Sequence, residues 1–226
     1  MARPAGDLET GGSAARIKSA AILAPLVLAV VYFGTPIFDI GVGIAGLILA
    51  WEWNRLCSGS FPWLIGGLFY IAGPCLALFY LRSDPVMGME TLFWLLAVVW
   101  STDTGAYIIG STIGGPKMSP VISPKKTWSG LLGGIGFACL AGYLTALILQ
   151  KSSVLPLVGW SAVIGAFSQA GDLAESWLKR HFGVKDTGTI LPGHGGLFDR
   201  VDGLLVAAPA VATIGIVNKG SILTWT

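Results

Sequence analysis

Hydrophobic residues in this chain are gathered into long runs that short polar segments separate. The runs cover residues 20–33, 37–53, 63–81, 91–113, 128–149, 154–177 and 204–223. Because about 20 apolar residues in a helix cross a bilayer, this pattern predicts seven transmembrane helices. The first two runs are short, with 14 and 17 residues, and a re-entrant pair would also explain them. The predicted range is therefore six to eight spans.

Composition supports the same class of protein. The chain has 54% hydrophobic and 12% charged residues, whereas soluble domains carry about 25% charged residues. We expect an all-α, polytopic transmembrane bundle in which residues 19–226 form a single membrane domain. Residues 1–18 are small and polar, which predicts a disordered cytoplasmic tail. The three cysteines have neither disulfide-framework nor zinc-site spacing and are interpreted as packing residues.

Basic residues are distributed unevenly between the two predicted sides of the membrane. With seven spans, 11 of the 14 lysines and arginines lie on the side of the N-terminus. Lysine and arginine concentrate in cytoplasmic loops, so the N-terminus is predicted to be cytoplasmic. The polar segment 172–202, between the last two runs, then lies at the cytoplasmic boundary.

Segment 172–202 holds nine of the 26 formally charged side chains. Four polar residues follow the i, i+3, i+4, i+7 pattern of one helix face: Asp172, Glu175, Ser176 and Lys179. A second acidic pair, Asp199 and Asp202, stands just before the last run. A carboxylate at membrane depth is costly unless it faces a polar cavity, a partner or a metal. Antiparallel neighbouring helices would bring the two acidic groups together.

The connection between these acidic groups is basic and rich in glycine. Its candidate phosphate ligands are Lys179, Arg180, Lys185, Arg200 and the turn of His194, Gly195 and Gly196. Carboxylates favour Mg²⁺, while basic side chains and exposed backbone N–H groups bind polyphosphate. This combination is typical of phosphoryl or nucleotidyl transfer. The alternative is a solvated loop whose charges pair with one another, and His194 could cap the loop rather than contact phosphate.

Two further polar sites are predicted on the same side. Asp103 interrupts the fourth run and is expected to point into the bundle, either as part of the site or as a structural hydrogen-bonding group. The segment 123–130, SPKKTWSG, is read as a loop that offers Ser123, Lys125, Lys126 and Thr127 to a phosphate or lipid headgroup. An ordinary basic membrane anchor would also explain it. Glu52 is predicted to pair with Arg55.

These motifs resemble a known enzyme family. The run S-x-x-K-R-x4-K-D-x-G-x2-L-P-G-H-G-G-x-x-D-R-x-D, residues 176–202, looks like the signature of phosphatidate cytidylyltransferases, also called CDP-diglyceride synthases. The elements QAGDLAES, DTGAY and SPKKTWSG resemble the same family, and the likeness covers a catalytic part at about 90–215. In many relatives a serine follows the final aspartate, where this chain has Gly203.

The resemblance implies that CTP and phosphatidic acid give CDP-diacylglycerol and pyrophosphate, with Mg²⁺ as cofactor. It implies a homodimer in the bacterial inner membrane. The family's metal-binding pair falls on Asp172 and Asp199, and the catalytic set on Asp172, Asp199, Lys179 and Arg200. The substrate-binding set is expected to be Ser123, Lys125, Lys126, Thr127, Glu175, Ser176, Arg180, Lys185, His194, Gly195, Gly196, Asp202 and Asp103.

Two other functions fit the sequence less well. Another membrane lipid-phosphate transferase, such as a CDP-alcohol phosphotransferase, would carry a DG-x2-AR run, which the sequence lacks. An ion-coupled transporter would place its acidic residues near the middle of the bilayer, whereas these acids gather at one predicted side.

Overall fold

The computed structural model describes residues 21–188 and 195–226, and long helices make up most of them. Their bounds are Ala21–Phe33, α2 (Ile37–Leu56), α3 (Phe61–Arg82), α4 (Gly88–Thr112), α5 (Trp128–Ile148), α6 (Leu155–His181), α7 (Phe198–Asn218) and the short α8 (Ile222–Trp225). Each of the seven predicted runs coincides with a helix, so the helical bundle is confirmed. The predicted tail, residues 1–18, lies outside the described residues.

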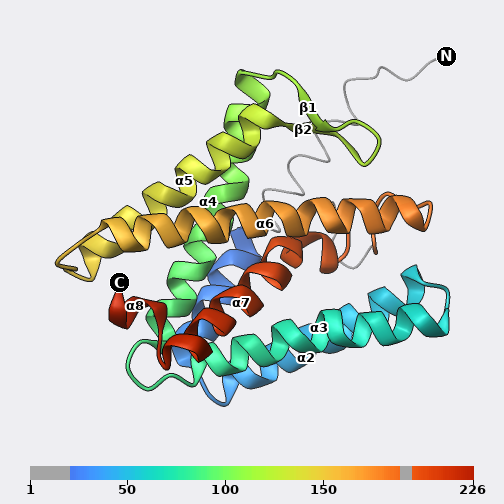
Figure 1. Ribbon diagram of the computed structural model, residues 1–226. Coiled ribbons are helices and arrows are strands. Elements are labelled where there is room, and N and C mark those ends of the chain that lie inside the picture. Colours follow the sequence, from blue (N-terminus) through green and yellow to red (C-terminus); the bar gives the residue numbers. More distant parts are fainter. Residues whose placement is uncertain (1–20, 189–194) are drawn as a thin grey trace.

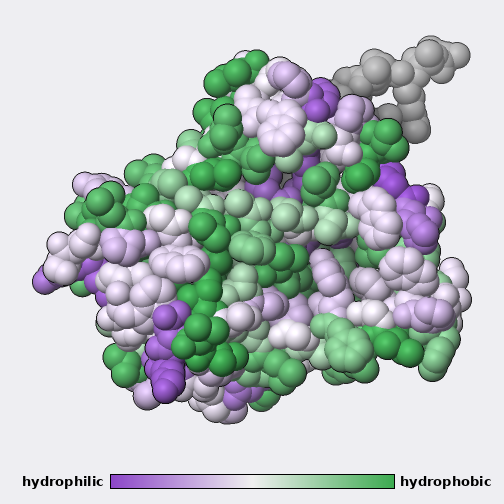
Figure 2. Space-filling view, viewed as in Figure 1, coloured by the Kyte–Doolittle hydropathy of each residue, from purple (hydrophilic) through white to green (hydrophobic). Residues whose placement is uncertain are grey.

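Five of the described helices, α2, α3, α4, α5 and α7, are long and apolar enough to cross a membrane. Large apolar side chains also cover the outside of the bundle; Leu47, Phe69 and Ile148 are each at least 73% exposed. Figure 2 shows hydrophilic side chains in small separate patches on a largely apolar face. The chain is therefore an integral membrane protein. Helix Ala21–Phe33 is shorter and α6 is more polar, so the count of seven spans stays a prediction.

Helix α6 runs through the middle of the bundle, with α5 on one side and α7, α3 and α2 on the other (Figure 1). Helix α4 crosses behind α6 and contacts elements on both sides of it. Helices α4 and α5 approach closely because small residues face each other. A methyl group on Gly130 would lie 2.9 Å from the Ala106 carbonyl, and one on Gly134 would lie 2.8 Å from the Thr102 carbonyl. These glycines therefore allow the two helices to pack closely. Gly114, which follows α4 at φ +66°, has open space around it.

The segment between α4 and α5 is a small antiparallel hairpin, where the sequence analysis expected a loop. Its strands are β1 (Lys117–Ser119) and β2 (Ser123–Thr127). Two glycines with positive φ and a proline precede β1, which prevents α4 from continuing. At the end of β2, Thr127 accepts a hydrogen bond from the Gly130 backbone N–H (3.1 Å) and caps α5.

The last long helix begins earlier than the hydrophobic pattern predicts. The pattern starts the span at residue 204, but α7 starts at Phe198, so Asp199 and Asp202 lie in its first two turns. Likewise α6 continues to His181 rather than ending at residue 177. Charged residues in the first or last turn lower the apolar signal without preventing the helix. Both acidic groups are consequently held on rigid helices.

Candidate active site

Four polar elements meet at one end of the bundle. They are the C-terminal end of α2, the β-hairpin, the C-terminal end of α6 and the N-terminal end of α7. Lys126 of β2 pairs with Asp172 of α6, and Arg180 of α6 donates to the Ile122 carbonyl between the strands (3.3 Å). Near the end of α2, Glu52 accepts a hydrogen bond from the Leu197 backbone N–H at the start of α7 (2.8 Å). Segments far apart in the sequence thus form one site.

An acidic group lies at the centre of this site. Asp172 and Glu175 come from successive turns of α6 and Asp202 from α7, and one carboxylate oxygen from each lies within 4.8 Å of the others. Glu175 is 2% exposed, whereas Asp172 and Asp202 are half-buried. The Lys126 ammonium group lies 2.7 Å from Asp172 Oδ2. Three ionised acids this close repel one another, and nearby cations reduce that repulsion.

Lys179 supplies the second cation and joins the two helices. Its Nζ lies 2.7 Å from Asp199 Oδ1 on α7 and 3.2 Å from Glu175 Oε1 on α6. All three side chains are largely buried, with 13%, 6% and 1% exposure for Lys179, Asp199 and Glu175. At this burial an ion pair is retained only when its charges are closely matched. Lys179 therefore holds α6 and α7 in register at the site.

Asp199 also organises the backbone around the start of α7. Its Oδ2 accepts the backbone N–H of Thr187 (3.0 Å) and of Gly196 (2.8 Å), together with the Thr187 hydroxyl (3.0 Å). Gly195 has φ +82°, and a methyl group there would lie 2.7 Å from the same oxygen. Asp199 is thus engaged with Lys179 and the backbone, while Asp172 is grouped with Glu175 and Asp202. The metal pair of Asp172 and Asp199 stays a prediction.

The other predicted site residues lie around this centre. Lys125, Lys185 and Arg200 are exposed, and Ser123 and Ser176 are half-buried. Arg180 is exposed and also donates to the Val184 carbonyl (3.1 Å). Asp103 is exposed on α4 and accepts a hydrogen bond from Gln169 of α6 (3.2 Å). His194 lies outside the described residues.

Glu52 is a polar residue whose contact the sequence analysis predicted wrongly. It does not pair with Arg55, which lies over the Trp51 ring at 4.8 Å. Instead its carboxylate accepts the backbone N–H groups of Leu197 and Phe198, both at 2.8 Å. The only signal in the sequence was an acid within an apolar run. Nothing there indicated a partner about 145 positions away.

Gly203, the departure from the signature, has a packing explanation. A methyl group at position 203 would meet the Ser168 hydroxyl of α6, which would have to turn away. Ser168 is fully buried on α6.

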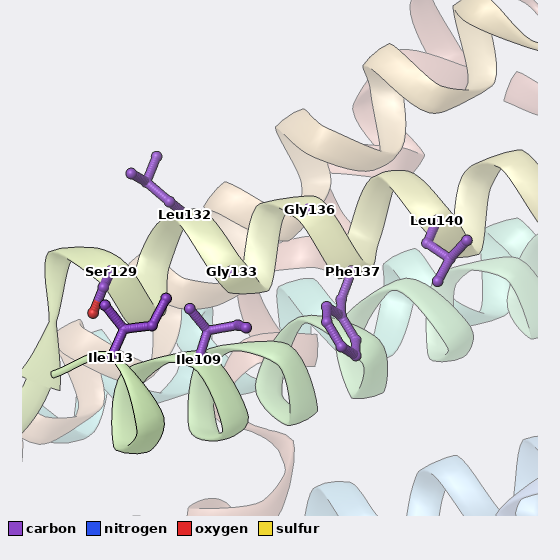
Figure 3. A pocket seen from close by; sticks show the side chains of 8 residues that line it. All are labelled: Ile109, Ile113, Ser129, Leu132, Gly133, Gly136, Phe137 and Leu140. Carbon is purple, nitrogen blue, oxygen red and sulfur yellow. The ribbon is translucent and has the colours of Figure 1, made fainter.

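A separate apolar groove of 560 Å³ lies between α4 and α5 (Figure 3). Leu132, Phe137 and Leu140 of α5 and Ile109 and Ile113 near the end of α4 line it, together with Ser129 and two glycines. No lining side chain carries a formal charge. The groove is therefore suited to hydrocarbon, in contrast to the charged end of the bundle.

Comparison with known proteins gives a consistent result. Residues 59–217 match the sequence profile of the cytidylyltransferase family. A phosphatidate cytidylyltransferase of Brucella suis is 44% identical over 183 residues, which cover 80% of this chain and 66% of that protein. A phosphatidate cytidylyltransferase of Rickettsia felis is 36% identical over 212 residues, which cover 89% of this chain and 91% of that protein. The chain thus spans about two thirds of the length of the Brucella relative.

Proposed function

The chain belongs to the cytidylyltransferase family, and we propose that it transfers the cytidylyl group of CTP to phosphatidic acid, giving CDP-diacylglycerol and pyrophosphate. The observation that carries this assignment is the polar end of the bundle, where Lys126 and Lys179 are held against three buried or half-buried acids. The site lies on helices of an integral membrane protein, where a lipid phosphate and a soluble nucleotide can meet.

The oxygen atoms of the acidic group are suitable ligands for a divalent cation. Asp172, Glu175 and Asp202 offer hard carboxylate oxygens within 4.8 Å of one another, and Mg²⁺ binds through one or two carboxylates together with phosphate oxygens and water. We assign Mg²⁺ to Asp172 and one acid of α7. Asp199, which the family resemblance favours, keeps unused lone pairs on Oδ1, because that oxygen accepts only from Lys179 in the described contacts. When bound, the ion neutralises charge on the reacting phosphate.

The chain's own residues supply binding and orientation. Lys126 and Lys179 are positioned to exchange their carboxylate partners for phosphate oxygens, and Arg180, Lys185 and Arg200 offer exposed cationic groups that are close in the sequence to Lys179 or Asp199. In the reaction an oxygen of phosphatidic acid attacks the α-phosphorus of CTP, the bond from that phosphorus to the bridging oxygen breaks, and pyrophosphate leaves. Catalysis of this kind depends on in-line positioning and charge stabilisation, and it needs no protein nucleophile.

Location and assembly follow from the same proposal. The site faces the cytoplasm of a bacterial cell from the inner membrane, because CTP is a soluble cytoplasmic substrate and the basic residues favour that side. The protein acts as a homodimer, as the family resemblance implies. Chemical crosslinking of the protein in native membranes tests the dimer, and a product that stays monomeric would contradict it.

The function is tested by incubating the purified chain with labelled CTP and vesicles that contain phosphatidic acid. We expect labelled CDP-diacylglycerol only when Mg²⁺ is present. Asp172→Asn should lower kcat by a factor of about 100 or more, as loss of a positioned catalytic charge does. Asp39→Asn removes an acid from the opposite end of α2 and should have no effect. An active Asp172→Asn variant would contradict the site, and absence of product from the parent chain would contradict the function.

A further inference from the structure

Glu52 is a fully buried carboxylate that lies before the segment matching the family profile. Its exposed fraction is 0%, and the match covers residues 59–217. Both carboxylate oxygens are engaged at 2.8 Å, Oε1 with the N–H of Leu197 and Oε2 with that of Phe198. A charged group at this depth requires such partners. The contact joins α2 to the start of α7.

The two N–H groups belong to Leu197, the N-cap residue of α7, and to Phe198, its first residue, where no helical carbonyl is available to them. A carboxylate at the N-terminus of a helix is further stabilised by the helix dipole. Since these are charge-assisted hydrogen bonds in a buried place, they are stronger than ordinary backbone contacts. Glu52 therefore fixes the point at which α7 begins.

That point also determines the position of Asp199. Three successive backbone N–H groups are divided between the two acids: Gly196 donates to Asp199, and Leu197 and Phe198 donate to Glu52. The backbone approaches Glu52 so closely that a methyl group on Gly188 or Gly196 would lie 2.8 or 2.6 Å from Oε1. Movement of Glu52 would accordingly shift the turn that presents Asp199 to Lys179.

Aromatic packing anchors the same turn from its apolar side. The Phe198 side chain is 0% exposed and packs against Trp53 of α2 and Tyr70 of α3, with ring centroids 5.8 Å from each. These two rings also stack on each other, at 5.6 Å. The indole N–H of Trp53 donates to the Trp63 carbonyl (2.7 Å), which links α2 to α3. Neighbouring residues of α2 thus hold the start of α7 by a polar contact and an apolar contact.

We propose that Glu52 is a positioning residue for the transfer reaction, which sets the start of α7 so that Asp199 and Asp202 face Lys179 and Asp172. This inference rests on the proposed function. It extends the functional unit to α2 and α3, beyond the catalytic part at about 90–215 that the family motifs indicate. Glu52 does so without contacting substrate.

The test compares Glu52→Gln and Glu52→Asp with the parent chain and with Asp39→Asn, which removes an acid from the other end of the same helix. Glutamine has the same volume as glutamate, but its NH₂ group must face an N–H donor and its charge is lost. Aspartate keeps the charge with a shorter reach. A purely space-filling role therefore predicts that Glu52→Gln is harmless, whereas positioning predicts that it is damaging.

Two measurements are made on the full chain in lipid nanodiscs. In the first, kcat and both KM values are determined with CTP and phosphatidic acid. We expect kcat of Glu52→Gln to fall about 10- to 100-fold, the loss of one charge-assisted hydrogen bond, with the KM for phosphatidic acid within twofold. Asp39→Asn should retain the parent kcat. A parent-like kcat in Glu52→Gln would overturn the proposal.

In the second measurement, hydrogen exchange is followed in peptides that contain Leu197 and Phe198. These amides should exchange at least 10-fold faster in Glu52→Gln, while peptides from α4 and α5 stay unchanged. Unchanged exchange at the start of α7, or equally faster exchange in every helix, would overturn the proposal. If the parent chain makes no product, the proposed function fails, yet the exchange result still decides whether Glu52 holds the turn.

Gly188→Ala disturbs the contact between Glu52 and the start of α7 while leaving the Glu52 carboxylate in place. The added methyl group would lie 2.8 Å from Glu52 Oε1, so the contact must shift. We expect lower kcat and faster exchange at Leu197 and Phe198, as in Glu52→Gln. A Gly188→Ala variant that matches the parent chain in both measurements would contradict the positioning role, even if Glu52→Gln failed to fold.

Discussion

Replacement of Lys179 by methionine isolates the contribution of the central cation. Methionine has a similar length and suits a buried site, so little cavity is created. The change removes the ammonium group that lies 2.7 Å from Asp199 and 3.2 Å from Glu175. Glu175 and Asp199 would then remain as carboxylates that are 1% and 6% exposed, without this partner.

The burial of these acids sets the expected size of the effect. Removing one partner of a buried ion pair costs about 3–5 kcal/mol, because the remaining charge stays desolvated. Lys126→Met breaks a pair whose members are 16% and 31% exposed, and water compensates part of that loss, so a smaller cost of about 1 kcal/mol is expected. Lys125 is exposed on the same strand, and Lys125→Met should change stability by less than about 0.5 kcal/mol.

The three variants are compared by unfolding in a titration with denaturing detergent, followed by circular dichroism. We expect the free energy of unfolding to decrease in the order Lys125→Met, Lys126→Met, Lys179→Met. In a Lys179→Met background, Glu175→Gln should restore part of the stability, because it removes one of the uncompensated charges. A Lys179→Met protein as stable as Lys125→Met would refute the assignment of Lys179 as the ion that joins α6 and α7.

Three further outcomes are expected. Asp202→Asn and Asp199→Asn should both raise the Mg²⁺ concentration that gives half-maximal activity. The larger increase identifies the α7 acid that binds the ion, and no increase in either variant would reject an α7 ligand. Thr127→Val removes the cap of α5 and should destabilise the protein by about 1 kcal/mol in the same detergent titration, whereas an unchanged midpoint would show that the cap contributes nothing. A single cysteine in place of Lys185 should react with a membrane-impermeant maleimide only in inverted vesicles, because the site is expected to face the cytoplasm. Labelling in intact cells would contradict that orientation.

Hydrophobic periodicity was sufficient to locate the helices, since each long apolar run needs its backbone hydrogen bonds satisfied within the membrane. The same pattern misplaced helix ends that carry charged residues. Asp199 and Asp202 belong to α7, but their polarity removed them from the predicted span. The hairpin was missed for a different reason, because strands of three and five residues leave too short a pattern to recognise.

Within the site, helical spacing correctly indicated that Asp172, Glu175 and Lys179 share one face of α6, and the structure brings Asp172 and Glu175 within reach of α7. Partners on other elements were beyond sequence reasoning. The ion pair of Lys126 with Asp172 and the contact of Glu52 with α7 depend on how whole helices pack. A local pattern identifies which residues are polar, but only tertiary structure determines which of them meet.

The pairing of charges has a consequence for how a substrate enters. Lys126 and Lys179 are each matched with carboxylates, so an arriving phosphate must compete with Asp172 and Asp199 for them. The acids released by this exchange would repel one another unless a divalent cation arrived with the nucleotide. Binding of the metal and of the polyphosphate should therefore be mutually dependent, each weak without the other. The start of α7, held by Glu52 and by the buried Phe198 ring, would keep its geometry during such an exchange.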